Sequence, residues 1–191
     1  MHATGCLRAE HRVIVGVLDC FEVALNRAAE AGCVRRGAFD PFIDFFRGFA
    51  DRCHHCKEEG SLFPILEKSG IPREGGPIGV MLEEHEQGRR HVRAMAESLA
   101  AADKADPAAA HAFLSEGRQF LMLLRQHIDK EDQVLFRMAD QVVQGGDLAQ
   151  LTNSYRSAES ESSYCDAFSR CRMIARELAA AYGVPNPGLA I

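Results

Sequence analysis

The sequence predicts an all-α protein, an up-down-up-down antiparallel four-helix bundle with an additional C-terminal helix. Apolar residues recur at helical spacing along the chain, and no segment shows the sustained alternation of a half-buried strand. Four of the expected helices are long and joined by short links, which is typical of an antiparallel bundle. The 191 residues are enough to enclose one hydrophobic core.

Local signals set the expected helix boundaries. Gly32 ends the first helix, and Asp40 with Pro41 is expected to start the second as N-cap and first helical residue. The same Asp-Pro signal at Asp106 starts the fourth, and the polar stretch 152–163 is expected to interrupt the helical pattern. We expect helices over residues 7–31, 40–68, 78–102, 107–144 and 164–182. The bundle would then occupy residues 1–146, with residues 147–191 as a helical extension packed on it.

Charge and composition narrow the function classes. The net charge of -5 is spread along the chain, which argues against nucleic-acid binding. No apolar run approaches the roughly 20 residues of a membrane-spanning helix, and the N-terminus does not resemble a signal peptide. The seven cysteines are expected to be reduced thiols. These features predict a cytoplasmic protein that acts on neither membranes nor nucleic acids.

The stretch "ADRCHHCKEEGSLFP" combines two cysteines, two histidines and two glutamates. A redox Cys-x-x-Cys relies on a helix N-terminus to lower the thiol pKa, but Cys53 and Cys56 lie in the middle of an expected helix. Haem attachment would require a histidine where Lys57 stands. Both cysteines are therefore expected to be small buried hydrophobic residues.

The histidine and glutamate doublets each have one member expected to face the core. At about 100° per residue, His55 and Glu59 point the same way as the apolar face of their helix, one turn apart. By the same geometry, His54 and Glu58 are expected on the solvated surface.

The fourth helix of the bundle repeats the arrangement, and the first and third each contribute one inward histidine. His127 and Glu131 form a second His-x3-Glu pair on the apolar face of the fourth helix. His11 lies on the apolar stripe of the first helix, and His85 on that of the third. Arg89 lies one turn after His85.

Together these residues predict a metal site. One inward histidine is more often a core residue satisfied by hydrogen bonds, but here all four helices contribute, and a buried carboxylate is costly unless it is paired or binds a metal. The expected ligands are His11, His55, Glu59, His85, His127 and Glu131. They exceed the four ligands of tetrahedral zinc, and calcium and magnesium prefer oxygen ligands. Two carboxylates able to bridge indicate a pair of metal ions about 3.5–4 Å apart, and imidazole with carboxylate suits non-haem iron.

The motifs "EH" (10–11), "HHCKEEGSLFP" (54–64), "MLEEHEQG" (81–88) and "HIDKEDQVLF" (127–136) resemble the hemerythrin-like, HHE cation-binding family over roughly residues 7–142. The resemblance implies a bundle enclosing two non-haem irons with an oxo or hydroxo bridge. Oxygen-carrying hemerythrins have a second histidine one turn after the third-helix ligand, where this chain has Arg89. The four-His, two-Glu set is more similar to the branch that repairs iron centres.

The resemblance leaves two classes of function open. The chain would be a metal-binding protein that binds or senses O2, NO or redox state, or a di-iron oxidoreductase or iron donor in nitrosative and oxidative stress and iron–sulfur repair. Its partner would be a small diatomic ligand or peroxide. Whether it is an enzyme, and which protein partner it has, is not determined by these residues.

Overall fold

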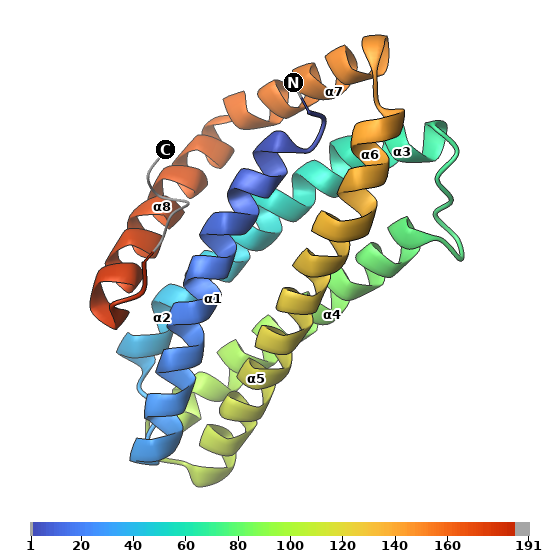
Figure 1. The fold of residues 1–191 in the computed structure, drawn as a ribbon. Coiled ribbons are helices and arrows are strands. Elements are labelled where there is room, and N and C mark those ends of the chain that lie inside the picture. The colour runs from blue at the N-terminus through green and yellow to red at the C-terminus, as the bar shows by residue number, and fades with distance from the viewer. Residues whose placement is uncertain (1, 186–191) are drawn as a thin grey trace.

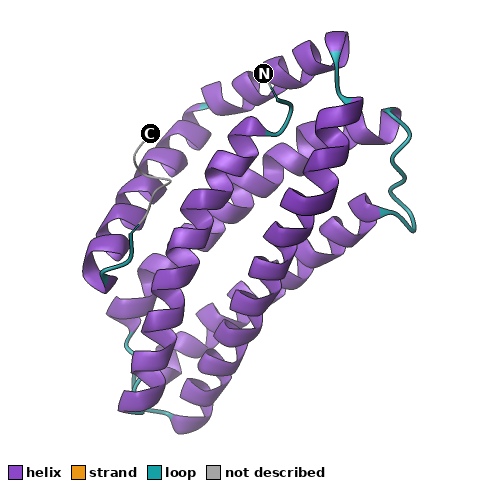
Figure 2. Cartoon of the chain, viewed as in Figure 1, coloured by secondary structure: helices purple, strands orange, loops and turns teal. Residues whose placement is uncertain are grey.

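The structure is a computed structural model that describes residues 2–185. The described part of the chain consists of helices joined by loops and contains no strand, so the predicted fold class is confirmed (Figure 2). The elements are α1 (Gly5–Ala31), α2 (Arg36–Phe45), η1 (Phe46–His55), η2 (Glu58–Leu62), α3 (Phe63–Lys68), α4 (Pro77–Ala102), α5 (Pro107–Lys130), η3 (Glu131–Leu135), α6 (Phe136–Val142), α7 (Gly145–Ser160) and α8 (Ser162–Tyr182). None of the described helices combines the length and apolarity needed to cross a membrane.

The bundle elements form four long rods, which lie antiparallel to one another (Figure 1). The first is α1, the second runs from α2 through η1 and η2 to α3, the third is α4, and the fourth runs from α5 through η3 to α6. They alternate in direction, as predicted. After the fourth rod, α7 crosses one end of the bundle and α8 returns along its outside, against α1 and η1.

The caps show which boundary signals hold. The Asp106 side chain accepts from the backbone N–H groups of Ala108 and Ala109, so this predicted helix start is confirmed. Asp40 does not cap: α2 begins earlier, at Arg36, and Asp40 accepts a hydrogen bond from the Arg36 side chain instead (2.9 Å). The predicted start of the second helix at Asp40 and Pro41 is therefore wrong.

The C-terminal region contains two helices in place of the one expected. The stretch 152–160, expected as an interruption, belongs to α7, and the break comes only at Glu161. Leu151 and Tyr155 are buried against the bundle end, and this burial stabilises a helix whose sequence is otherwise polar. The expected boundary at residue 146 stays a prediction, and it falls inside α7.

Three segments of the bundle are π-helical: η1, η2 and η3. A π-helix closes i→i+5 hydrogen bonds and is wider than an α-helix, so each residue turns by less than 100°. Adjacent residues therefore point in more similar directions than they would in an α-helix. Such segments frequently occur at functional sites.

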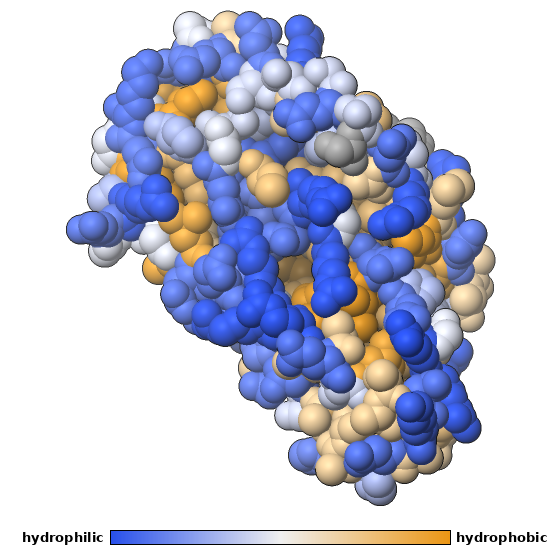
Figure 3. Space-filling view, turned by 180° about the vertical axis from the view of Figure 1, so that it is seen from behind, coloured by the Kyte–Doolittle hydropathy of each residue, from blue (hydrophilic) through white to orange (hydrophobic). Residues whose placement is uncertain are grey.

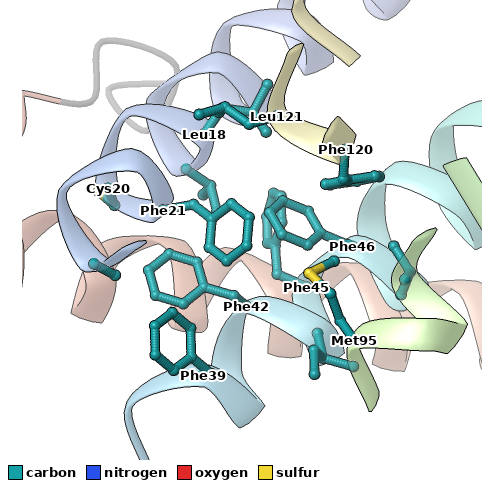
Figure 4. Close-up of a cluster of buried hydrophobic side chains, with 14 of the residues drawn as sticks. Leu18, Cys20, Phe21, Phe39, Phe42, Phe45, Phe46, Met95, Phe120 and Leu121 are labelled. Atoms are coloured by element: carbon teal, nitrogen blue, oxygen red, sulfur yellow. The ribbon is translucent and has the colours of Figure 1, made fainter. Parts of the chain in front are cut away.

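Two large apolar clusters fill the interior of the bundle, separated by a polar layer, and a third, small cluster joins Cys53 to Tyr164 and Ala167 of α8. The larger cluster fills the end of the bundle near α2 and contains packed phenylalanine rings (Figure 4). Phe21 and Phe46, for example, meet edge to face with ring centroids 5.2 Å apart. The smaller cluster fills the other end, beneath α7. Each rod passes from one cluster to the other, and the histidines and glutamates lie where it crosses between them.

Candidate metal centre

Seven buried side chains form the polar layer, and we call them the centre. All four rods contribute, and each of these residues is at most 6% exposed. The members are His11, His54, His55, Glu58, His85, His127 and Glu131.

The donor atoms of the centre form two sets, and within each set they lie within 4.8 Å of one another. The three-histidine group is His55, Glu58, His85 and His127. The two-histidine group is His11, His54, Glu58 and Glu131. Glu58 belongs to both groups, so its carboxylate lies where it could bridge two ions.

In the three-histidine group, two imidazole rings point their Nε2 atoms toward each other. The Nε2 atoms of His85 and His127 lie 3.2 Å apart, and both rings place Nδ1 against a carboxylate. With the protons on Nδ1, both Nε2 atoms carry lone pairs directed into the same space. A cation between or beside them would stabilise this arrangement, and neutral imidazole is the form that binds metal.

Carboxylates outside the centre orient its imidazoles. Four rings have Nδ1 within hydrogen-bond distance of a carboxylate oxygen, to which an N–H there donates. These pairs are His11–Asp132 (3.1 Å), His54–Glu10 (3.0 Å), His85–Glu59 (2.7 Å) and His127–Glu84 (3.0 Å). Such contacts orient each ring so that its Nε2 faces the interior of the centre, where it could bind a metal ion. In the fifth ring, His55 Nδ1 lies 3.6 Å from Asp51 Oδ1.

Several polar atoms of the centre have no hydrogen-bond partner among the described residues. Both carboxylate oxygens of Glu58, Oε1 of Glu131, Nε2 of His54 and both ring nitrogens of His55 are buried and make no hydrogen bond there. The nearest histidine nitrogens to the Glu58 oxygens, on His54 and His85, lie 3.5 Å away. Buried polar groups are otherwise nearly always satisfied, and leaving one unsatisfied costs roughly 1–3 kcal/mol. The donor set and these unpaired atoms fit a centre that holds metal ions.

The electrostatics of the centre favour ligand forms. Burial and neighbouring histidines lower the pKa values of His54 and His55 well below the ordinary range, so both are neutral. Burial would raise the pKa of Glu131, but His127 and other nearby imidazoles outweigh it and hold the value at about 2. Burial and the Glu131 carboxylate raise the pKa of Glu58 well above its usual range. A bound metal cation would stabilise the ionised form of Glu58 against burial and the Glu131 charge.

The structure brings together five of the six ligands predicted from the sequence, and Glu59 is the exception. Its side chain is 30% exposed, and it accepts hydrogen bonds from His85 Nδ1 and from Arg89 Nη2, each at 2.7 Å. Glu59 therefore orients a histidine of the centre. Arg89 also pairs with Asp51 and Glu86, so it is held by carboxylates outside the centre.

The predicted exposure of His54 and Glu58 is wrong. His54 is 1% exposed and Glu58 is fully buried, and both have donor atoms in the centre. The 100° rule misplaced them because His54 lies in η1 and Glu58 in η2, where each residue turns by less. The sequence carried one relevant signal: both doublets offer a His-x3-Glu pair, His54–Glu58 as well as His55–Glu59.

A cavity of about 200 Å³ leads to one side of the centre. It lies between η1, α4 and α5, and His55, His85 and His127 are part of its wall. The residues that belong only to the two-histidine group do not line this cavity. They are His11, His54 and Glu131. The three-histidine group is thus the half of the centre that a small molecule in this cavity would reach.

The hemerythrin HHE cation-binding domain model matches residues 2–139. The chain belongs to this family. No curated protein and no solved structure matches the chain significantly. Together, membership of a cation-binding hemerythrin family and the two buried donor groups identify a metal-binding protein.

This hemerythrin-family chain carries a buried lysine next to its centre. Lys57 is 1% exposed and donates to Glu10 and to Glu159 (3.1 Å), with its ammonium 5.4 Å from the ring centroid of Tyr164. Burial would lower the pKa of Lys57, but Glu10 and Tyr164 outweigh it and raise the pKa. Glu10 also bonds His54. A chain of contacts therefore joins the end of α7 and the start of α8 to the two-histidine group.

The cysteines lie outside both donor groups. Cys53 is fully buried, as expected, and burial raises its pKa to about 12. The expectation for Cys56 is wrong, because its side chain is exposed. All seven cysteines are free thiols.

Proposed function

We propose that this protein is a non-haem di-iron protein that binds or senses O2, NO or redox state at its centre. The observation that carries the proposal is Glu58, a fully buried carboxylate that has no hydrogen-bond partner in the described part of the chain and belongs to two donor groups at once. A carboxylate in this position suits two adjacent cations. Imidazole and carboxylate ligands with vacant positions suit non-haem iron.

Each donor group would hold one iron ion. Each offers four protein ligands, which is fewer than the six of an octahedral ion, so positions remain for exogenous ligands. When bound, iron would supply one-electron redox chemistry and affinity for small diatomic molecules. The chain's own residues orient the imidazoles through carboxylate contacts at Nδ1 and exclude bulk water from the centre.

The number of histidine donors in the centre differs from the number on which similarity to one branch of the family was based. With His54 in the centre, the donor set is five histidines and two glutamates, one imidazole more than the sequence predicted. Arg89 does not ligate, and the additional imidazole comes from the second rod. Similarity to the iron-centre repair branch rested on a four-histidine set, so the proposal does not depend on that branch.

A second function is favoured by the cavity. At about 200 Å³ it is far larger than a diatomic molecule, and it reaches the three-histidine group from the outside. A reactant such as peroxide could enter by this route, which suits an oxidoreductase. An iron donor to damaged iron–sulfur centres belongs to the same alternative. For either function we propose a cytoplasmic protein with no nucleic-acid or membrane partner.

The test is the metal content and optical spectrum of protein purified from iron-supplied cells. The proposal expects two irons per chain and a spectrum that changes on addition of O2 or NO. Catalysed loss of peroxide or NO, above that of free iron, would select the oxidoreductase. Zinc at one ion per chain, or iron loading unchanged by Glu58→Gln, would refute the di-iron centre.

A further inference from the structure

We propose that the cavity beside the three-histidine group binds a small organic anion, with its apolar body inside and its negative group at the mouth. This proposal rests on the proposed function, because the three-histidine group forms part of the cavity wall. It names the class of molecule that would reach that group.

The walls suit an apolar body. Apart from the histidines, the buried lining is hydrophobic and comes from η1, α4 and α5. These residues are Phe46, Ala50, Val92, Phe120 and Leu124, with Leu123 half-buried beside them. Figure 3 shows the molecule from behind, where hydrophilic side chains border a recess with hydrophobic side chains on its floor.

The size excludes a diatomic gas as the best-fitting occupant. An apolar cavity of about 150 Å³ binds benzene, with six carbon atoms. By the same ratio, the cavity of about 200 Å³ holds roughly eight non-hydrogen atoms. A molecule of the size of hexanoate or benzoate fills it.

The charges at the cavity favour a negative group. The charged lining residues are three arginines and two carboxylates, namely Arg47, Arg89, Arg93, Asp51 and Glu84. This local excess of positive charge occurs in a protein whose net charge is -5.

Only part of that positive charge is neutralised. Arg89 pairs with three carboxylates, those of Asp51, Glu59 and Glu86, and is fully engaged. Glu84 pairs with His127 and Lys130. Arg47 and Arg93 are exposed, and neither forms an ion pair with another described residue. Two guanidinium groups are therefore available to a carboxylate, which arginine can bind through two parallel hydrogen bonds.

Glycine at position 88 keeps the cavity open. Gly88 is buried on α4 and lines the cavity, and a Cβ built there would meet Phe120 at 3.7 Å, an ordinary contact. The backbone therefore tolerates a side chain at this position, and a larger one would occupy the space of the ligand.

The test is calorimetric titration of the full chain with benzoate, in metal-free and iron-loaded forms. Benzoate is expected to bind saturably, with benzyl alcohol and acetate each at least about tenfold weaker because one lacks the charge and the other the apolar body. Gly88→Leu is expected to weaken benzoate at least about tenfold, and Arg47→Gln with Arg93→Gln about tenfold. Gly37→Leu and Arg90→Gln, at exposed positions outside the cavity, serve as matched controls and should leave affinity unchanged.

Should Gly88→Leu not fold, Leu123→Trp fills the cavity from the opposite helix and is held to the same expectation. Equal affinity for acetate and benzoate, no saturable binding, or binding unaffected by the cavity-filling and arginine variants would overturn the inference. The experiment distinguishes failure of the anion site from failure of the di-iron centre. Benzoate binding without iron loading would refute only the di-iron centre, and iron loading without benzoate binding only the anion site.

Discussion

Replacing Glu58 by glutamine is expected to remove metal from both halves of the centre, whereas the same change at Glu59 should leave both ions bound. The two residues are adjacent and chemically identical, but Glu58 contributes a donor atom to both groups and Glu59 to neither. Glu58→Gln leaves three protein ligands in each group. Glu59→Gln changes only the contact that orients His85.

The size of the effect follows from mass action. An ion present at about 100 times its Kd stabilises the folded state by about 2.7 kcal/mol, so two ions contribute about 5 kcal/mol. For a protein of this length that raises the Tm by about 10–20 °C. This increase should vanish in Glu58→Gln. Loss of an orienting contact costs about 10–100-fold in metal affinity, so Glu59→Gln should reduce the increase by only about 3–9 °C.

Without metal, the order of stability of the parent and Glu58→Gln should reverse. Burial and Glu131 raise the pKa of Glu58, so its contribution to stability is complete below the ordinary value of 4.5 and is lost as pH rises through the raised value. Glutamine does not ionise. Metal-free Glu58→Gln should therefore be more stable than the metal-free parent at alkaline pH, and the difference should shrink toward pH 4.

The assay combines iron per chain after anaerobic equilibrium dialysis with thermal unfolding in iron and in chelator. Two irons in Glu58→Gln and none in Glu59→Gln would mean that the inward face of the second rod is assigned wrongly. An unchanged melting curve after verified iron removal from the parent would contradict a metal centre in the bundle core.

Three further results are expected. In the metal-free protein, burial would lower the pKa of His11, but hydrogen bonds to Asp132 and Glu131 outweigh it and raise the pKa to about 9. The contribution of His11 to folding stability is therefore complete below pH 6.5 and is lost as pH rises through 9. Melting temperatures measured against pH should show this loss in the parent and not in His11→Gln. Lys57→Met leaves the buried Glu10 carboxylate without its cation and should cost about 3–5 kcal/mol in denaturant unfolding, much of it restored by adding Glu10→Gln. Arg89→Met removes a cation that holds the carboxylate bound to His85 Nδ1, so iron titration should show about tenfold weaker binding of one ion and no change in the other.

The fold and most of the centre could be predicted because they depend on local patterns. Asp106 marks a helix start through its own side chain, and His11, His85 and His127 lie on long regular apolar stripes. Over such α-helical stretches, 100° per residue keeps the inward face correct. The antiparallel arrangement then follows from the short links between the rods.

The errors arise where the backbone or a distant contact departs from those patterns. The glutamate of the second rod was misassigned because His54 and Glu58 lie in π-helical segments, and no single residue type signals such a segment. The α7 helix was missed because its polar sequence is stabilised by tertiary packing of Tyr155. Burial of Lys57 requires Glu10 and a residue of α7, which are remote in sequence.

Contacts of the buried Lys57 connect the C-terminal helices to the two-histidine group. Glu159 and Tyr164, at the junction of α7 and α8, hold Lys57, which holds Glu10 against His54. If release of this junction weakens metal binding by some factor, then metal must strengthen docking of the junction by the same factor, because such linkage is reciprocal. Protection of α7 and α8 from amide hydrogen exchange would then report the occupancy of a centre that neither helix ligates.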